Sequence, residues 1–156
     1  MIVGIIAIST NYAIGKDGKL PWHYRSDLRF FKETTTGNAV VMGARTWRSI
    51  RKPLPNRLNI VLSRSDVVDA PRGVLKLGSV DDVVELAAYL DCDVFIIGGA
   101  TTYAEFAGVI EKWMVTLIPE EIAGADTFMP RDFLDRFENN ETVLLEDGLV
   151  VEVFRR

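Results

Sequence analysis

Apolar and polar positions follow two patterns along this chain: short apolar runs predict strands, and longer amphipathic segments predict helices. Strands are expected over residues 2–8, 39–42, 58–62, 74–77, 94–97, 113–118, 142–146 and 149–154. Helices are expected over residues 25–35, 46–50, 80–90 and 101–107. Ser79 is expected to cap the third helix. Residues 10–24, which contain Gly15, Gly18 and Pro21, are expected to form a long loop.

The order of these elements predicts the fold class. Strands alternate with helices through most of the chain, as is typical of a parallel sheet flanked by helices. The last two strands are joined by Asp147-Gly148, a strong signal for a tight antiparallel turn. We therefore predict one α/β domain over residues 1–156, with a mostly parallel sheet of about eight strands and an antiparallel C-terminal hairpin.

Composition and charge narrow the classes of function. The net charge of −4 argues against a nucleic-acid partner. No apolar run has the length of a membrane helix, and residues 1–8 lack the features of a signal peptide. The single Cys92 and single His23 offer neither an internal disulfide nor a zinc cluster, and a Ser-His-Asp triad has no other support. We expect a cytoplasmic protein without metal, membrane or nucleic acid.

One carboxylate, Asp27, lies between two groups of apolar residues, Leu20, Pro21 and Trp22 before it and Leu28, Phe30 and Phe31 after it. Residues four apart on a helix share a face, so Asp27 and Phe31 are expected to point the same way. A buried charge without its partner costs about 3–5 kcal/mol, and a flat, nitrogen-rich ligand would supply that partner. The alternative is that Ser26 and Asp27 only cap the helix.

Two junctions between a strand and a helix carry glycines. Residues 43–46 combine Gly43 with Arg45, and residues 98–102 begin with two glycines. Glycine allows close approach to the backbone, and a helix N-terminus favours anions. The second junction lacks the GxGxxG spacing of a dinucleotide motif, and such glycines can also serve only a tight turn. Two junctions on one parallel sheet suggest a ligand with a diphosphate.

Two further segments carry arginine. Arg64, which hydroxyl residues flank at the end of a strand, can hold a phosphate monoester, or it is only an exposed loop charge. Residues 53–57 contain two prolines that stiffen the segment leading to Arg57, whose planar fork suits a carboxylate. An acid, a guanidinium and apolar residues fit a ligand with a basic ring and a carboxylate. These apolar residues are Leu28, Phe31, Ile50 and Leu54.

In its motifs and their order, the chain resembles the dihydrofolate reductases over about residues 1–130. The matching residues are Ile14-Gly15, Leu20-Pro21-Trp22, Asp27-Leu28, Phe31-Lys32, Val41-Met42-Gly43, Thr46-Trp47, Ser49-Ile50, Pro53-Leu54-Pro55, Arg57, Asn59, Leu62-Ser63-Arg64, Ile97-Gly98-Gly99, Tyr103, Thr116 and Asp126-Thr127-Phe128. The resemblance implies reduction of 7,8-dihydrofolate to 5,6,7,8-tetrahydrofolate by NADPH, for one-carbon and thymidylate metabolism. A hydride would pass from nicotinamide C4 to pterin C6, and a proton to N5. It also implies a monomer that binds antifolate inhibitors.

The resemblance implies four catalytic residues. Asp27 would bind the 2-amino group and N3 of the pterin, and Thr116 would support that carboxylate by a hydrogen bond. Trp22 would hold a water at the pterin edge, and Tyr103 would lie beside the nicotinamide. Asp27 would grip the side of the ring away from N5, so we expect a water to deliver the proton there.

The remaining implied contacts divide between substrate and cofactor. The implied substrate residues are Ile5, Ala7, Leu20, Asp27, Leu28, Phe31, Lys32, Ile50, Leu54, Thr116 and Arg57, the last for the α-carboxylate of the glutamate tail. The implied cofactor residues are Ala7, Ile14, Gly15, Leu20, Gly43, Ala44, Arg45, Thr46, Leu62, Ser63, Arg64, Ile97, Gly98, Gly99, Ala100, Thr101, Thr102 and Tyr103. Residues 10–24 are expected to act as a lid that excludes water.

The chain departs from the family pattern at three places. Ala44 and Thr101 stand where many members have basic residues, so preference for NADPH would rest mainly on Arg45 and Arg64. The C-terminal hairpin is shortened to Asp147-Gly148, which removes a loop that steadies the lid in some relatives. We nevertheless expect a lid that favours its closed state.

Three other functions stay open at this point. A reductase of the riboflavin pathway shares the fold, but it is not expected to combine Asp27, Phe31 and Arg57. A non-catalytic folate- or nucleotide-binding protein would have no need of the full set that Asp27 forms with Trp22, Tyr103 and Thr116. A structural role would leave Asp27 without a partner and both glycine junctions unexplained.

Overall fold

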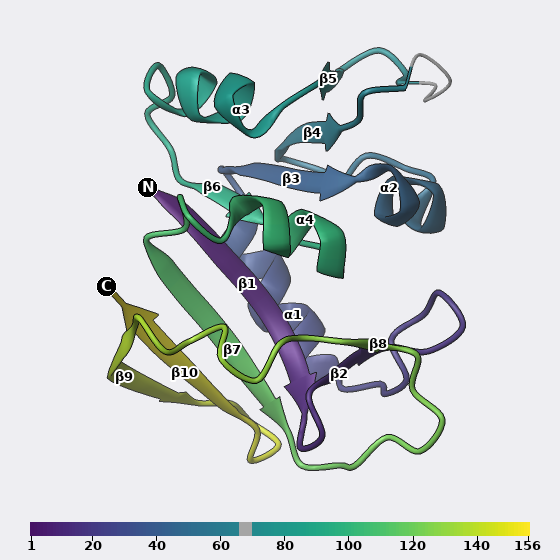
Figure 1. The fold of residues 1–156 in the computed structure, drawn as a ribbon, viewed down its shortest axis with the longest axis vertical. Coiled ribbons are helices and arrows are strands. Elements are labelled where there is room, and N and C mark those ends of the chain that lie inside the picture. The colour runs from purple at the N-terminus through teal and green to yellow at the C-terminus, as the bar shows by residue number, and fades with distance from the viewer. Residues whose placement is uncertain (66–69) are drawn as a thin grey trace. The chain divides into compact units, whose positions relative to one another are not determined.

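The computed structural model describes residues 1–65 and 70–156 (Figure 1). The chain forms two compact units, one of residues 1–4 and 35–110 and the other of residues 5–34 and 111–156. The helices are α1 (Arg25–Thr35), α2 (Ala44–Ile50), α3 (Val80–Ala87) and α4 (Ala100–Phe106). The strands are β1 (Ile2–Ser9), β2 (Ala13–Gly15), β3 (Ala39–Gly43), β4 (Leu58–Leu62), β5 (Val74–Leu77), β6 (Val94–Ile96), β7 (Lys112–Ile118), β8 (Thr127–Phe128), β9 (Glu138–Leu144) and β10 (Val150–Arg155).

Eight of these strands form one sheet, in the order β5-β4-β3-β6-β1-β7-β10-β9. The strands from β5 to β1 in this order pair in parallel, and β10 pairs antiparallel with both β7 and β9. The predicted α/β class, mostly parallel sheet and C-terminal hairpin are therefore confirmed. Strand β1 places its first residues in the first unit and the rest in the second.

The first unit is built on strands that are apolar at nearly every position. Val40, Val41 and Met42 on β3 and Ile60 and Val61 on β4 have no exposed surface. A parallel strand that is buried on both faces has no position for a polar alternation, which explains the continuous apolar runs in the sequence. Helix α3 begins as predicted, because the Ser79 hydroxyl accepts a hydrogen bond from the Asp82 backbone N–H at 3.1 Å.

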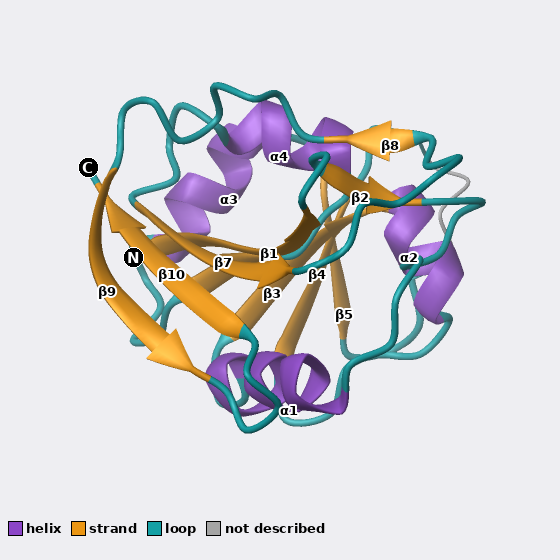
Figure 2. Ribbon diagram, turned by 90° about the horizontal axis from the view of Figure 1, so that it is seen from below, coloured by secondary structure: helices purple, strands orange, loops and turns teal. Residues whose placement is uncertain are grey.

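The second unit combines a half-buried antiparallel sheet with a small apolar cluster. On β10, Val151 and Val153 are buried and alternate with less buried positions. Strand β9 forms the edge (Figure 2), and its polar residues discourage pairing with another chain. The apolar cluster consists of Ala13, Trp22, Ile118, Ile122 and Leu149, with Ala7, Tyr24, Ala125 and Leu145 packed against it.

The prediction that residues 10–24 form a loop throughout is wrong. Strand β2 within this segment pairs antiparallel with β8. The Asn11 side chain both donates to the Ile122 carbonyl and accepts from the Ile122 N–H, each at 3.1 Å. The Asp17 N–H donates to the Asp126 carboxylate at 2.8 Å. These partners lie more than 100 residues away in the sequence, so no local pattern could reveal them.

Several element boundaries also differ from the predictions. Helices α2 and α4 begin directly after a glycine, at Ala44 and Ala100, earlier than predicted, and α3 ends at Ala87. Strand β9 begins at Glu138, because an exposed edge strand needs no apolar pattern. In the described part of the chain, every helix is too short or too polar to cross a membrane.

The cap of α3 provides a direct test of the local analysis. Replacing Ser79 by Ala removes the acceptor for the Asp82 N–H, so the free energy of unfolding should fall by about 1 kcal/mol. Urea denaturation measures this change. Ser79→Thr keeps a hydroxyl acceptor and should retain most of the stability; an unchanged Ser79→Ala variant would contradict the assigned cap.

Candidate active site

Helix α1 carries the acid that the sequence singled out. The helix begins at Arg25, so Ser26 and Asp27 are its second and third residues and neither occupies the capping position. The alternative that they serve as N-caps is therefore not supported. Asp27 and Phe31 are both half-buried and lie one helical turn apart, which places a carboxylate and an aromatic ring on one face, as predicted.

The Asp27 carboxylate is held by Thr116 of strand β7. The Thr116 hydroxyl donates a side-chain hydrogen bond to it, and Thr116 itself is buried. Burial is the largest influence on Asp27 and raises its pKa above the ordinary value; the Thr116 hydrogen bond opposes this rise, and the negative charge of Asp147 adds to it. The hydrogen bond predicted between Asp27 and Thr116 is therefore present, and the net pKa is raised.

Trp22 brings a second polar group that needs a partner. Its ring is buried in the apolar cluster of the second unit. Its Nε1–H is also buried, and among the described residues it has no hydrogen-bond acceptor. Leaving a buried N–H unpaired costs about 1–3 kcal/mol, so this group fits a site where a ligand or its solvent supplies the acceptor.

Other predicted residues of the second unit differ in exposure. Ile5 is buried on β1 and Ala7 on the same strand is half-buried, as residues lining a pocket would be. Leu28 and Lys32 on α1 are exposed. Leu20 is also exposed, and it lines a partly open cavity of about 530 Å³ together with Lys16, Asp17, Lys19, Pro21 and residues 121–123. Ile14 and Gly15 belong to β2.

In the first unit, the two glycine junctions lie next to each other. Strands β3 and β6 pair in parallel, and the Gly43 N–H donates to the Gly98 carbonyl at 2.9 Å. The approach is close, because a Cβ atom on Gly43 would come within 2.6 Å of the Thr102 hydroxyl. Gly98 has a φ of 124°, which residues with a side chain rarely adopt. The prediction that one parallel sheet carries both junctions is confirmed.

The helices that follow these junctions begin without side-chain caps. Gly43 and Gly99 precede α2 and α4, and neither helix has a side-chain cap or an acidic residue in its first turn. Helix α3 has both, through Ser79 and the two aspartates that follow. The first-turn N–H groups of α2 and α4 can therefore bind an external anion.

Hydroxyl and cationic side chains surround these helix starts. Thr46 is half-buried, Thr102 is buried and Thr101 is exposed. Arg45 and Arg64 are exposed, and neither forms an ion pair within residues 1–65 and 70–156. The other predicted cofactor residues of this unit are Ala44, Leu62, Ser63, Ile97, Ala100 and Tyr103, all partly or fully buried. This set of donors fits a phosphorylated ligand.

Arg57 is oriented by Pro55, one of the prolines expected to stiffen this segment, and by Thr35, to which the sequence assigned no role. Its Nε–H donates to the Pro55 carbonyl at 2.9 Å and its Nη1–H to the Thr35 hydroxyl at 3.1 Å, and burial lowers its pKa. The buried Asn59 side chain holds the same segment through hydrogen bonds with Leu54 N–H, Leu54 C=O and Arg57 C=O. Asn59 stands in the matched motifs, but only the structure shows what it does. Ile50 and Leu54 are half-buried.

A protein-family model described as dihydrofolate reductase matches residues 1–147. The chain belongs to the dihydrofolate reductase family. It is 43% identical to the type 3 dihydrofolate reductase of Salmonella typhimurium over 136 residues, 86% of this chain and 81% of the relative. It is 39% identical to the dihydrofolate reductase of Haemophilus influenzae (strain ATCC 51907 / DSM 11121 / KW20 / Rd) over 127 residues, 81% of this chain and 77% of the relative. The resemblance predicted from the order of motifs is confirmed.

The fold also matches that of a solved dihydrofolate reductase. The structure of the Enterococcus faecalis enzyme complexed with NADP(H) and RAB-propyl aligns with a TM-score of 0.91 at 34% sequence identity. The alignment covers 100% of this chain and 96% of that chain. Membership of the dihydrofolate reductase family favours the predicted function over the riboflavin-pathway alternative and over a structural role.

The raised pKa of Asp27 predicts how stability depends on pH. The folded state binds the Asp27 proton more tightly than the unfolded state, so this stabilising contribution is complete below the unfolded pKa and is lost as pH rises through the folded pKa. Asp27→Asn removes this dependence. Relative to the parent, the variant should therefore gain stability between acidic and neutral pH.

Urea denaturation across this pH range measures the difference. Asp132→Asn, a matched change at an exposed position of the same unit, should show no such trend. If the difference between Asp27→Asn and the parent stays constant with pH, burial of the Asp27 carboxylate does not raise its pKa.

Proposed function

We propose that Asp27, Thr116 and Trp22 bind and orient the pterin ring of dihydrofolate in this protein. As a member of its family, the chain is an NADPH-dependent oxidoreductase that reduces 7,8-dihydrofolate to 5,6,7,8-tetrahydrofolate. One observation carries the proposed roles: the half-buried Asp27 carboxylate shares a helix face with Phe31 and accepts a hydrogen bond from Thr116 of β7.

The pterin supplies what this carboxylate lacks. Its 2-amino group and N3 present two parallel N–H donors, a spacing that matches the two oxygens of a carboxylate. Such paired donors favour the charged form of Asp27 and offset the cost of its burial. Thr116 restrains the carboxylate in position, and Phe31 offers an aromatic face to the ring.

Protonation of N5 calls for a different route. A carboxylate that holds the 2-amino group and N3 lies on the other side of the ring from N5. We therefore assign Asp27 to binding and to electrostatic tuning of the pterin, and a water to delivery of the proton. The buried Trp22 N–H, which has no acceptor among the described residues, is suited to orient that water.

The first unit supplies the groups for the cofactor. When bound, NADPH provides the hydride that reduces C6 of the pterin. The uncapped N-termini of α2 and α4 are suited to its diphosphate, and Thr46 and Thr102 add hydroxyl donors there. Tyr103 of this unit is proposed for the nicotinamide, and Ile14 and Leu20, which belong to the second unit, are proposed for the same role.

Selection of NADPH over NADH depends on few charges in this chain. Ala44 and Thr101 bring no charge. We therefore propose that Arg45 and Arg64 bind the 2′-phosphate, with Ser63 as a neighbouring hydrogen-bond donor. Both guanidinium groups are exposed, which suits recognition of a phosphate that itself stays partly hydrated.

Arg57 is proposed for the α-carboxylate of the substrate's glutamate tail. Its planar fork binds a carboxylate at two points, and the bonds to Pro55 and Thr35 restrict its rotation before the ligand arrives. Antifolates that carry the same recognition groups would use the same residues.

A monomer in the cytoplasm remains our expectation, and sedimentation of the purified protein tests the oligomeric state.

We propose that residues 10–24 form a lid that favours its closed state. The β2–β8 pairing and the bonds of Asn11 and Asp17 tie this segment to residues 120–128, which supports an ordered lid without the longer hairpin loop of some relatives. NMR relaxation measurements with cofactor bound test this, since a dominant open lid would refute it.

The decisive test of function is dihydrofolate-dependent oxidation of NADPH by the purified protein. Asp27→Asn keeps one acceptor oxygen and replaces the other by an N–H donor, so one charge-assisted hydrogen bond is lost and the other is weakened, and kcat/KM at neutral pH should fall by about 10²-fold or more. NADH in place of NADPH should be used less efficiently, and Asp132→Asn should leave the rate unchanged. A folded parent that binds NADPH but does not oxidise it with dihydrofolate would contradict the proposal, as would a fully active Asp27→Asn.

A further inference from the structure

The turn between β9 and β10 reaches back to the helix that carries Asp27. The turn is closed by hydrogen bonds from Leu145 N–H to Leu149 C=O at 2.8 Å and from Gly148 N–H to Leu145 C=O at 3.1 Å. Leu149 is buried in the apolar cluster of the second unit, which anchors the turn. The two residues at its tip, Glu146 and Asp147, are exposed acids.

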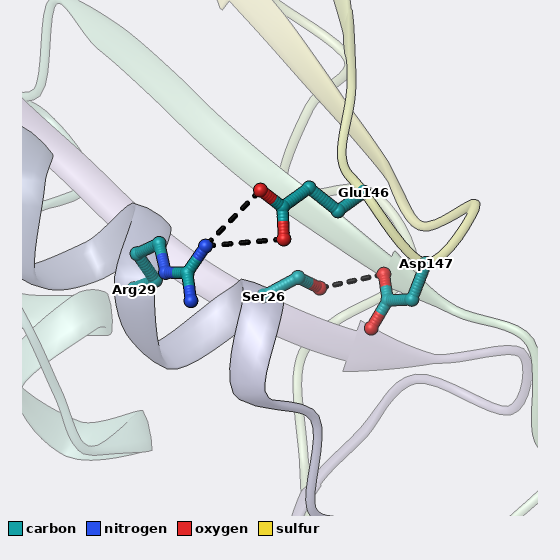
Figure 3. Close-up of polar contacts among 4 residues, drawn as sticks. All are labelled: Ser26, Arg29, Glu146 and Asp147. Atoms are coloured by element: carbon teal, nitrogen blue, oxygen red, sulfur yellow. Dashed lines mark hydrogen bonds and ion pairs between the residues drawn. The ribbon is translucent and has the colours of Figure 1, made fainter.

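Both acids bind side chains in the first turn and a half of α1 (Figure 3). The Ser26 hydroxyl donates to Asp147 Oδ1 at 2.6 Å, and Arg29 Nη1 donates to both carboxylate oxygens of Glu146 at 3.1 Å. Ser26 and Arg29 lie three residues apart on one face of the helix. Asp27 directly follows Ser26 and lies between these two attachment points.

The two acids differ in how their charge is balanced. Glu146 pairs with Arg29 across an exposed ion pair. Asp147 receives a hydrogen bond from the neutral Ser26, and within the described residues it forms no ion pair. Its negative charge therefore remains uncompensated close to the start of α1, where it adds to the effect of burial in raising the pKa of Asp27 and to the effect of the Glu120 hydrogen bond in raising the pKa of Tyr24.

We propose that the C-terminal hairpin turn positions Asp27 and sets its electrostatic environment, with Ser26 and Asp147 as positioning residues for the reaction. This inference rests on the proposed role of Asp27 in binding the pterin. A shortened hairpin was expected only to remove a contact with the lid; in the structure the turn instead attaches to α1. The chain thereby joins its C-terminal hairpin to the helix that presents the acid.

The charges around Asp27 define what the turn contributes. On β7 the facing group is the neutral Thr116 hydroxyl, and on α1 Arg29 is already paired with Glu146. Tyr24, ahead of the helix, donates its hydroxyl proton to Glu120. The charge that acts on Asp27 from the turn is therefore that of Asp147, which makes the carboxylate a stronger acceptor for the pterin N–H groups.

The test separates charge from hydrogen bonding. Asp147→Asn removes the charge but keeps an oxygen that can accept from Ser26, whereas Ser26→Ala keeps the charge and removes the donor. Carboxyl-carbon NMR of the free protein follows the titration of Asp27 in each variant. Asp132→Asn is the control for the same change in net charge elsewhere in the unit.

At low salt, Asp147→Asn should lower the pKa of Asp27, because the negative charge of Asp147 is one of the influences that raise it. The difference should vanish at about 1 M salt, where charges are screened over about 3 Å. Asp132→Asn should not shift the titration. An Asp147→Asn titration equal to that of the parent at low salt would overturn the electrostatic part of the proposal.

Kinetics test the positioning part. Ser26→Ala should raise KM for dihydrofolate about threefold with little change in kcat, as expected when one hydrogen bond no longer restrains the helix start. An unchanged KM would overturn this part. The NMR titration needs no turnover, so a shift in Asp147→Asn without any dihydrofolate reduction in the parent would uphold the electrostatic link and contradict the proposed function instead.

Discussion

A carboxylate that is partly withdrawn from water must be stabilised by donors, and Asp27 imposes this demand on the second unit. Burial raises its pKa, and the Thr116 hydroxyl offsets only part of that effect. The free protein thus holds a carboxylate whose charged form is less stable than in water. A ligand with paired N–H donors binds more tightly for that reason, since the donors recover what burial costs. The buried Trp22 N–H also needs a partner, but because it is a donor it needs an acceptor.

The first unit solves a related problem with backbone groups. In helix α3 the Ser79 side chain accepts a hydrogen bond from a first-turn N–H group, whereas α2 and α4 directly follow glycines, which offer no side chain for this purpose. Glycine is needed here for space as well, because a side chain at residue 43 would collide with Thr102. The glycines therefore have two effects: they let the ends of two strands come close, and they leave the N-termini of the following helices available for phosphates.

The sequence predicted what depends on neighbouring residues. Apolar runs in the sequence predicted the parallel strands, and the position of Ser79 before α3 predicted its role as a helix cap. The pair Asp147-Gly148 predicted the C-terminal turn. The bond between Asp27 and Thr116 was reached through the family resemblance, because the 89 positions that separate them hide it from any local pattern. The β2–β8 ladder, the support of Arg57 by Asn59 and the bonds from the hairpin turn to α1 escaped prediction. Each of these three features depends on which distant or irregular segments lie close together in the fold. Polar residues on exposed loops have no periodic pattern that would indicate such contacts.

The roles proposed for Asp27, Thr116 and the hairpin turn share one premise, that the pterin replaces water as the partner of the Asp27 carboxylate. Titration of Asp27 by carboxyl-carbon NMR, with folate and NADP⁺ bound, tests this premise most directly. The account predicts that the bound ligand keeps Asp27 ionised to well below the pH at which it takes up a proton in the free protein, because the pterin N–H groups favour the charged form. A carboxyl group that titrates in the complex as it does in the free protein would contradict the account.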